Sequence, residues 1–417
     1  MAKEFDLGCV RGAAGATGPA GPAGPAGAPG VTPRISVGNT FSLAPGAEPY
    51  VELRDGSSPE APVLDFGIPA ATADMNSSVY DPHNRHQDIF AYADSHGGRG
   101  ATIIVAAADS RNKDSADFIC AGESDQLVLS RAINSLPAGG GSILLMEGTY
   151  HLDTEGLEPS GGIYRLLHIG ASHVSITGQG SATLLKLEDA AVGAGVTCAL
   201  VGISGDDFYM SRLTLDGSKA NNSGTVHGIY QLVGADSCTV ESCNVKNCSG
   251  SGIKIHGNAS GIKDNKVSGC DKGMDIGGTE SYVRGCEFND GNIGIYVGNC
   301  SHGVVIDNRV SNNAQKGICL SYATYYQVVS NVLLDNPIGI YQEYSSENSF
   351  FLNIVKRSDY VVGQGSTNYG EGEYPFRFVE CQRCAALFNR FFGKGTSMKN
   401  TEAITMNFVS NNWNMTT

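Results

Sequence analysis

A period of about 22 residues constrains this chain more than any other feature of its sequence. A glycine followed by Ile or Met recurs at intervals of 24, 21, 21, 23 and 22 residues. The pairs are Gly228-Ile229, Gly252-Ile253, Gly273-Met274, Gly294-Ile295, Gly317-Ile318 and Gly339-Ile340. A second column keeps step with them and comprises Cys243, Asn265, Cys286, Asn308, Asn331 and Asn353. Two columns with one period indicate a stack of structural repeats.

Each repeat has the pattern of short alternating strands and lacks a helical period, which is typical of one coil of a parallel β-helix. Such a coil buries its inward side chains only against its neighbours. We therefore expect the Ile or Met of each pair to point inward as one stack. The Asn/Cys column is expected at a turn, where stacked amides bond one another and the backbone. Leucine-rich repeats share the period, but the LxxLxL pattern is missing.

The chain contains 55 glycines, and some of them lie near the N-terminus, outside the 22-residue repeats. Glycine occupies every third position from Gly12 to Gly30, which makes seven unbroken triplets with four interspersed prolines. Only glycine fits at the axis where three polyproline-like chains meet, so the sequence predicts a collagen-like stalk over residues 12–32. At about 3.1 Å per residue the stalk would be roughly 60 Å long. A flexible Ala/Gly/Pro linker is the alternative.

Local patterns divide the rest of the chain. Residues 1–11 precede the stalk, and residues 33–72 contain short β-like runs between Pro/Gly turns, which predict a small β module. Residues 73–112 are expected to form a linker with a short helix that begins at Asp81-Pro82. The β-helix is expected over residues 113–417. A second helix, Ser124 to Ser135, would cap its first coil, because an open stack of repeats exposes strand edges.

Charge and composition exclude several function classes. Lys and Arg number 28 against 42 Asp and Glu, which gives a formal charge of −14 and argues against nucleic acid as a partner. The sequence has neither an apolar run of 18 residues nor an apolar N-terminal segment, so we expect no membrane insertion and no signal peptide. We also expect no cofactor and no metal. Cys381 and Cys384 form a lone CxxC pair, and the cysteines are expected to be buried thiols.

Two passages resemble known families. The segment SADFICAGESDQLVLSRAINSLPAGGGSILLMEGTYHL resembles the opening of pectate-lyase-like right-handed β-helix proteins. The collagen-like run followed by TPRISVGNTFSLAPG, LDFGIP and VYDPHNRHQDIFAYAD is similar to tail fibres of phages and prophages of Gram-positive bacteria. Together they imply an all-β homotrimer, a tail fibre or tailspike with a right-handed parallel β-helix. Neither passage specifies a reaction.

The resemblance also implies partners and a location. Residues 1–11 would attach to phage tail or baseplate proteins, and the β-helix would face a host surface polysaccharide. The protein would be assembled in the bacterial cytoplasm and become part of the extracellular virion tail. A bacterial surface adhesin is a third interpretation, and the missing signal and wall anchor disfavour it.

The register of the repeats predicts which side chains share the outward face of one sheet. The position between two inward residues is occupied in turn by Tyr230, Lys254, Asp275, Tyr296, Cys319 and Tyr341, and the next outward position by Leu232, His256, Gly277, Gly298, Ser321 and Glu343. Tyr rings suit sugar rings, and charged side chains bond hydroxyls or carboxylates. The candidate glycan-binding residues are therefore Tyr230, Lys254, His256, Asp275, Tyr296, Tyr341 and Glu343, around a shallow groove at the glycines. An ordinary stabilising cross-strand ladder is the alternative.

The alternative function is a polysaccharide depolymerase, a lyase or glycoside hydrolase, on the same β-helix. A hydrolase needs two carboxyl groups about 5 to 5.5 Å or about 6.5 to 9.5 Å apart. Asp275 and Glu343 lie three coils apart, roughly 14 Å at strand spacing, which is too far. Asp264 and Asp307 share one register at roughly 9.5 Å, so Asp264, Asp307 and Asp275 are the candidate catalytic residues. A lyase would use Lys254 or His256 as the base.

Overall fold

The computed structural model describes residues 34–69 apart from 45–46 and 60, and residues 101–414 apart from 357–373, 393–397, 402–407 and 411–412. The chain comprises two compact units, Met1–Asp88 and Ile89–Thr417. The collagen-like run at 12–32 and the short helix expected after Asp81 lie outside the described residues.

The first unit contains a three-stranded sheet. Its strands are β1 (Ser36–Leu43), β2 (Tyr50–Leu53) and β3 (Val63–Pro69), in the order β1-β3-β2. β1 runs parallel to β3, and β2 runs antiparallel to it. Asp65 accepts hydrogen bonds from the Arg54 guanidinium at 2.7 and 3.1 Å. Because Val37, Val51, Leu53 and Ile68 are each more than half exposed, this sheet has almost no apolar core within one chain.

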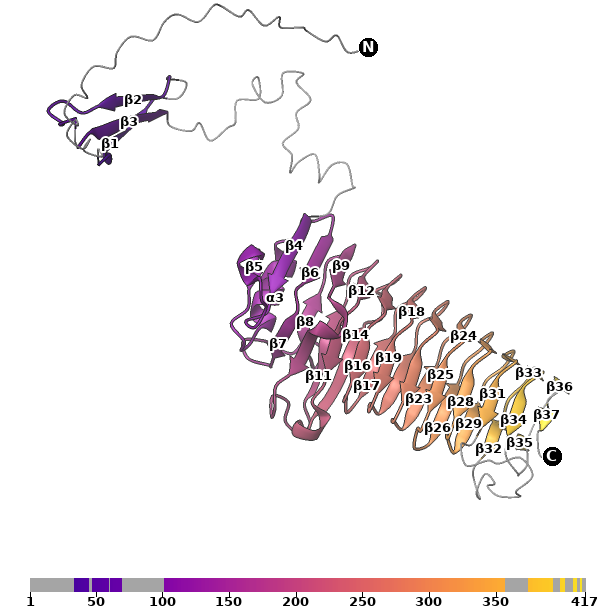
Figure 1. The fold of residues 1–417 in the computed structure, drawn as a ribbon. Coiled ribbons are helices and arrows are strands. Elements are labelled where there is room, and N and C mark those ends of the chain that lie inside the picture. The colour runs from indigo at the N-terminus through magenta and orange to yellow at the C-terminus, as the bar shows by residue number, and fades with distance from the viewer. Residues whose placement is uncertain are drawn as a thin grey trace, which may run out of the picture. The chain divides into compact units, whose positions relative to one another are not determined.

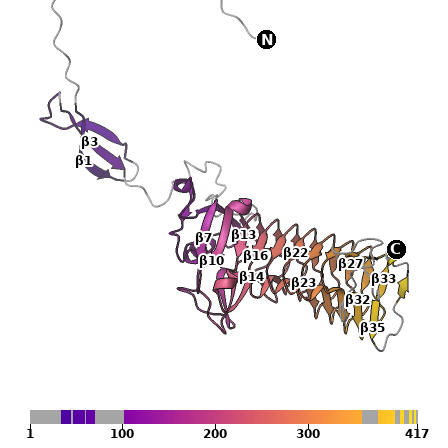
Figure 2. The same cartoon turned by 60° about the horizontal axis from the view of Figure 1, so that its bottom comes forward.

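The second unit is a parallel β-helix, and this confirms the all-β fold class predicted from the repeats (Figure 1). Each coil contributes one strand to each of three parallel sheets that run along the stack (Figure 2). The thirteen-stranded sheet consists of β4 (Ala101–Ala106), β5 (Phe118–Ile119), β6 (Gly141–Leu145), β9 (Val174–Thr177), β12 (Tyr209–Ser211), β15 (Thr239–Glu241), β18 (Gly261–Lys263), β21 (Tyr282–Arg284), β24 (Val304–Ile306), β27 (Gln327–Val329), β30 (Ser349–Phe351), β33 (Ala385–Leu387) and β36 (Phe408–Ser410).

The other two sheets complete each coil. The eleven-stranded sheet consists of β7 (Gly148–Leu152), β10 (Thr183–Leu187), β13 (Thr214–Asp216), β16 (Asn244–Lys246), β19 (Lys266–Ser268), β22 (Glu287–Asn289), β25 (Arg309–Ser311), β28 (Val332–Leu334), β31 (Ile354–Lys356), β34 (Arg390–Phe392) and β37 (Trp413–Asn414). The ten-stranded sheet consists of β8 (Ile163–Ile169), β11 (Thr197–Ile203), β14 (Thr225–Gln231), β17 (Ser251–Ile255), β20 (Lys272–Ile276), β23 (Ile293–Gly298), β26 (Lys316–Ser321), β29 (Ile338–Glu343), β32 (Tyr374–Val379) and β35 (Met398–Thr401).

The inward stack predicted from the Gly pairs is confirmed. Its members are fully buried and are Cα partners from coil to coil, in the order Ile229, Ile253, Met274, Ile295, Ile318 and Ile340. Burying one such side chain is worth about 1.5–3 kcal/mol, so the stack is a main source of stability. A Cβ on Gly228 would lie 2.5 Å from the Gly252 carbonyl oxygen, which explains why the preceding position is glycine.

The Asn/Cys column lies at the turn between the thirteen-stranded and eleven-stranded sheets, as predicted. The side-chain oxygen of each Asn accepts a hydrogen bond from the backbone N–H of the preceding coil, for example Asn331 from Asn308 at 3.0 Å. The column continues to Asn389, whose Oδ1 accepts bonds from the backbone and side-chain nitrogens of Asn353. We call this turn the amide corner. Sequence reasoning missed Asn389 because residues 357–373 interrupt the period.

The eleven cysteines of the described residues are all buried thiols, as predicted. Cys243 and Cys286 occupy the amide corner, and burial raises the pKa of each to about 12. Cys381 is buried too, and Gln342 Nε2 donates to Cys384 Sγ at 2.8 Å. These thiols therefore act as small core side chains and are poor nucleophiles.

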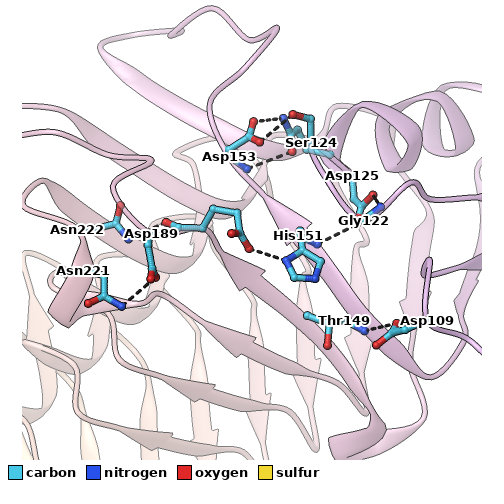
Figure 3. A network of polar contacts seen from close by, with 12 residues as sticks. Asp109, Gly122, Ser124, Asp125, Thr149, His151, Asp153, Asp189, Asn221 and Asn222 are labelled. Atoms are coloured by element: carbon cyan, nitrogen blue, oxygen red, sulfur yellow. Dashed lines mark hydrogen bonds and ion pairs between the residues drawn. The ribbon is translucent and has the colours of Figure 1, made fainter.

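The predicted capping helix is present as α3 (Gln126–Asn134), which buries Leu129, Ala132 and Ile133. The buried Asp125 fixes its start, because its carboxylate accepts backbone N–H bonds from Gly122 and His151 at 2.9 Å each (Figure 3). Three 3₁₀ turns, Lys113–Ser115, Gly180–Ala182 and Lys219–Asn221, complete the described helical structure.

Candidate functional site

The outward row predicted on the ten-stranded sheet is observed as a ladder of Cα partners. It runs through Tyr230, Lys254, Asp275, Tyr296, Cys319 and Tyr341. The pairing extends it to His168 and Gly202 at one end and to Arg377 at the other. A second outward row starts three residues earlier on each strand and includes Ser251, Lys272, Ile293, Lys316 and Ile338. Sequence reasoning missed that second row.

Polar and aromatic side chains gather at the end of the row that lies nearer α3 in the sequence. We call them the polar cluster: His227, Tyr230, Lys254, His256, Lys272 and Asp275. The Lys254 ammonium lies 4.6 Å from the centre of the Tyr230 ring. The same ring meets His256 edge-on, with the ring centres 5.8 Å apart. The cluster thus surrounds one aromatic face with cationic and imidazole groups.

Asp275 is the only carboxylate of the polar cluster, and its charge is already engaged. Its side chain is 11% exposed, Lys272 Nζ lies 3.1 Å from Oδ2, and His256 Nε2 lies 4.0 Å from Oδ1. Burial alone would raise the pKa of Asp275, but the nearby His256 and Lys272 outweigh it and hold the pKa below its usual value. With Lys254 and Lys272 against Asp275, the cluster carries a local charge of +1 before its histidines are counted.

His227 is held as a neutral imidazole with a defined tautomer. The backbone N–H of Ser251 donates to its Nδ1 at 3.0 Å, so the proton of the neutral ring lies on Nε2. Burial and the positive charge of Lys254 lower the pKa of His227 to about 4. His227 has no place in the repeated Gly marker, so the period gave no reason to select it.

The other end of the row is closed. Cys319 and Tyr341 are 1% and 8% exposed, and they pack with Ile338 against Ile293, Tyr296 and Val379. The Tyr341 hydroxyl donates to Glu343 Oε2 at 2.8 Å, and Ser321 donates to Oε1 at 3.0 Å. The structure therefore brings Tyr230, Lys254, His256 and Asp275 together and places Tyr341 and Glu343 in a mostly covered group. Tyr296 joins the two groups, because its ring packs in the covered group and Lys272 Nζ lies 3.9 Å from its centre.

The prediction of a shallow groove at the glycines is wrong. A Cβ on Gly277 would lie 2.8 Å from Cδ2 of His256, and one on Gly298 would lie 2.5 Å from Cε1 of Tyr296. The two rings lie across the glycines and occupy the space above them. The rings of His256 and Tyr296 therefore fill the space that the missing side chains leave.

The two remaining candidate catalytic residues lie elsewhere. Asp264 and Asp307 are exposed residues at the amide corner, both with left-handed backbone conformations of φ 52° and 58°. Gly285 occupies the equivalent turn position in the coil between them. Arg284 Nε lies 3.8 Å from Asp307 Oδ2. Asp275 points out of the ten-stranded sheet instead. The three aspartates thus do not form one constellation, and a left-handed turn accounts for the first two.

A further polar network lies beside the N-terminal coils (Figure 3). His151 Nδ1 lies 2.5 Å from Glu188 Oε1, and Asn221 Nδ2 donates to Asp189 at 2.9 Å. Asn222 accepts from the backbone of Val192 at 2.8 Å. These groups bind one another and the connections after β10 and β13, so they anchor loops and leave few polar atoms for a ligand.

A metal site and a membrane-spanning helix are both absent from the residues that the structure describes. Among them, no three His, Cys, Asp or Glu side chains are grouped to hold a metal ion. No helix in the same described ranges is long and apolar enough to span a membrane.

Comparison with known proteins agrees with the fold. Residues 227–375, which include the polar cluster, match the family model for a right-handed β-helix region. The second unit is accordingly a right-handed parallel β-helix. Mannuronan C5-epimerase AlgE5 of Azotobacter vinelandii is 28% identical over 219 residues, which are 48% of this chain and 21% of that protein. The chain thus spans about a fifth of the length of this relative.

Solved structures show the same architecture. The A-module of mannuronan C5-epimerase AlgE4 from Azotobacter vinelandii aligns with a TM-score of 0.53 at 16% identity, over 70% of this chain and 93% of the module. The enzymatically active domain of tailspike protein 2 from bacteriophage CBA120 aligns with a TM-score of 0.49 at 13% identity, over 64% and 40% of the two chains. No conclusion rests on this second, weaker likeness.

Proposed function

We propose that the chain is the subunit of a phage or prophage tail fibre or tailspike, and that its polar cluster binds an acidic polysaccharide of the host surface. The observation that carries the binding function is the cluster itself, which sets the partly exposed Tyr230 between two imidazoles and Lys254, with Lys272 paired to Asp275 beside them. An apolar ring face with polar groups around it suits a sugar ring. The local positive charge in a chain of net charge −14 favours a carboxylated sugar.

The tail-fibre part of the proposal depends on the N-terminal sequence and on the first unit. A three-stranded sheet whose apolar residues are this exposed needs further chains to cover it. We propose that two more copies do so, in a homotrimer joined by the collagen-like run at 12–32. Residues 1–11 would then attach to the tail or baseplate, and the mature trimer would be an extracellular part of the virion.

Binding is tested with polymannuronate as the probe, by titration calorimetry on the full chain. Lys254→Gln and Lys272→Gln should each weaken binding about tenfold or more, because a hydrogen bond to a charged group contributes about 1.5–3 kcal/mol. Lys263→Gln is the matched control, since Lys263 lies over the Tyr282 ring at 5.6 Å on the thirteen-stranded sheet. Equal binding by all three variants would contradict the proposed site.

The trimer is tested by sedimentation equilibrium of the full chain, which should give three times the subunit mass of 43.6 kDa. Gly21→Ala with Gly24→Ala should lower the temperature at which the trimer dissociates, because alanine does not fit at the triple-helix axis. Ala20→Ser is the control at a position away from that axis. A monomer at every protein concentration would overturn the assembly.

A second candidate function, an enzyme acting on a uronate polymer, is favoured by one observation. The polar cluster combines two lysines with an uncharged His227 and the hydroxyl of Tyr230. Removing the proton beside a sugar carboxylate needs a positive group that neutralises the carboxylate and groups that take and return a proton. The relative AlgE5 is named as a C5-epimerase, which is consistent with such chemistry. A two-carboxylate hydrolase is disfavoured, because within the described residues Asp275 is the one carboxylate of the polar cluster.

One incubation distinguishes these functions. Purified trimer is mixed with polymannuronate, and polymer size, unsaturated ends, reducing ends and C5 configuration by NMR are followed. Unsaturated ends would identify a lyase. Inversion at C5 without loss of polymer size would identify an epimerase, and new reducing ends without unsaturation would identify a hydrolase. An unchanged polymer that remains bound identifies a binding protein.

A further inference from the structure

A second corner of the β-helix carries an unusual set of exposed rings. It is the connection from the ten-stranded to the thirteen-stranded sheet in four successive coils, at residues 299–302, 322–325, 344–347 and 380–383. We call it the aromatic corner. Its middle residues form a row of parallel bridges that links Ser301, Thr324, Ser346 and Gln382. This row is a polar floor with one column of side chains on each side.

The rings of the aromatic corner stack in pairs along both columns. Tyr322 and Tyr344 are parallel within 14°, with ring centres 5.0 Å apart. In the second column His302 and Tyr325 are parallel within 17°, at 4.8 Å. The three tyrosines are 56%, 44% and 48% exposed in the order Tyr322, Tyr344 and Tyr325. Two short stacks of rings therefore flank a floor of hydroxyl and amide groups.

Backbone preference does not explain these tyrosines. Tyr322, Tyr325 and Tyr344 have φ values of 51°, 57° and 47°, in the left-handed region. This conformation costs a bulky residue about 1–2 kcal/mol, and Asn or Gly avoids the cost. The positions equivalent to Tyr325 in earlier coils share this conformation and hold Ser237, Ala259, Glu280 and His302. An exposed ring in a strained position points to a role at the surface.

A hollow adjoins the stacked rings. It has a volume of about 380 Å³ and is lined by Tyr344, Ser345, Ser346, Glu380 and Gln382. Beyond it, an ion pair joins Arg383 to Glu347. The corner therefore has two carboxylates for one guanidinium, a net charge of −1. This charge is opposite to that of the polar cluster and disfavours a polyanion.

We infer that the aromatic corner is a second saccharide site, which binds a neutral sugar chain. The outer faces and edges of the rings offer apolar surface to the C–H side of a sugar, while Ser346, Gln382 and Glu380 bond its hydroxyls. The site differs from the polar cluster in position, charge and ligand class. It holds whether or not the polar cluster binds an acidic chain.

The test uses the full chain on an array of neutral and acidic bacterial surface oligosaccharides. Tyr322→Asn and Tyr344→Asn remove the rings and keep a residue that accepts the left-handed backbone, so the fold is preserved. We expect both to weaken binding to neutral glycans roughly tenfold or more and to leave polymannuronate binding unchanged. Tyr322→Phe should retain binding. Leu352→Asn is the matched control, an exposed residue at φ 56° on the amide corner.

Three results would overturn the inference. The first is an array on which the unaltered chain binds no neutral glycan. The second is equal binding to neutral glycans by the Asn variants and the unaltered chain. The third is dissociation of the oligomer in the Asn variants by light scattering, because the corner would then be covered by another copy. If the unaltered chain binds neutral glycans and does not bind polymannuronate, only the proposed role of the polar cluster is rejected.

Discussion

The amide corner and the aromatic corner are turns of the same coils, but they use their side chains in opposite ways. At the amide corner the repeated residue points inward, is fully buried and bonds the coils above and below, as Asn331 does. At the aromatic corner the repeated residue points outward, is half exposed and occupies a strained backbone, as Tyr322 does. The comparison separates what stacking requires of a coil from what stacking leaves free.

The largest effect is expected at the amide corner. Asn331 Nδ2 donates to Val305 O at 2.9 Å, and its Oδ1 accepts from both nitrogens of Asn308. Asn331→Ala leaves several buried polar groups without partners, each at about 1–3 kcal/mol, so we expect unfolding free energy to fall by about 4 kcal/mol. Urea unfolding measures this. Asn312→Gly, at an exposed turn position with a φ of 55°, should cost less than about 1 kcal/mol, because glycine accepts the left-handed backbone. Equal losses in the two variants would remove the distinction between inward and outward turn residues.

This contrast also explains how much could be predicted from the sequence. Inward columns repeat because each coil must fill the same space, so the period located the Ile stack and the amides. Strand alternation likewise gave the direction of Tyr341 and Cys319. Alternation does not give exposure, which depends on neighbours such as Lys316, whose Nζ lies 3.7 Å from the Tyr341 ring centre. The aromatic corner was missed because exposed turn residues follow no packing period.

The second prediction contrasts a buried amide with a buried imidazole. The pKa of His227 is lowered to about 4 from an ordinary 6.5, so the unfolded chain binds the proton more readily. Its contribution to stability is therefore complete above about pH 6.5 and is lost as the pH falls toward 4, by roughly 3 kcal/mol. Burial is the main cause of the lowered pKa; the charges of Lys254, Lys272 and His256 lower it further, and Asp275 opposes them.

The measurement is urea unfolding between pH 4 and 7. His227→Gln keeps an acceptor for the Ser251 N–H and removes the titration, so its stability should vary much less in this window. Asn331 does not ionise, and the loss caused by Asn331→Ala should be the same at both ends of the range. A parallel pH dependence in the His227→Gln variant and the unaltered chain would contradict the assignment.

A smaller effect, of opposite sign, is expected at an exposed position of the amide corner. Leu352 precedes Asn353, is 57% exposed and has a φ of 56°. Leu352→Gly removes the clash of a side chain with the left-handed backbone and should raise the unfolding free energy by about 1 kcal/mol. Thermal unfolding detects such a gain. Ser330→Gly, at a φ of 54° in the preceding coil, is the control, because it introduces glycine at the equivalent backbone position in place of a smaller side chain. A loss of stability in Leu352→Gly would mean that the exposed leucine makes contacts in the assembled protein.

The smallest effect is expected at the two exposed aspartates of that same column. Asn tolerates the left-handed backbone as well as Asp does, and the contact between Asp307 and Arg284 is a long surface ion pair. Asp264→Asn with Asp307→Asn should change the unfolding free energy by less than about 0.5 kcal/mol. Binding to polymannuronate and any change of the polymer should also be unaltered, because the column supplies turn residues and the polar cluster faces another side. If the double variant lost an activity that Lys254→Gln and Lys272→Gln retain, the chemistry would belong to the amide corner and the sheet face would be only a stabilising ladder.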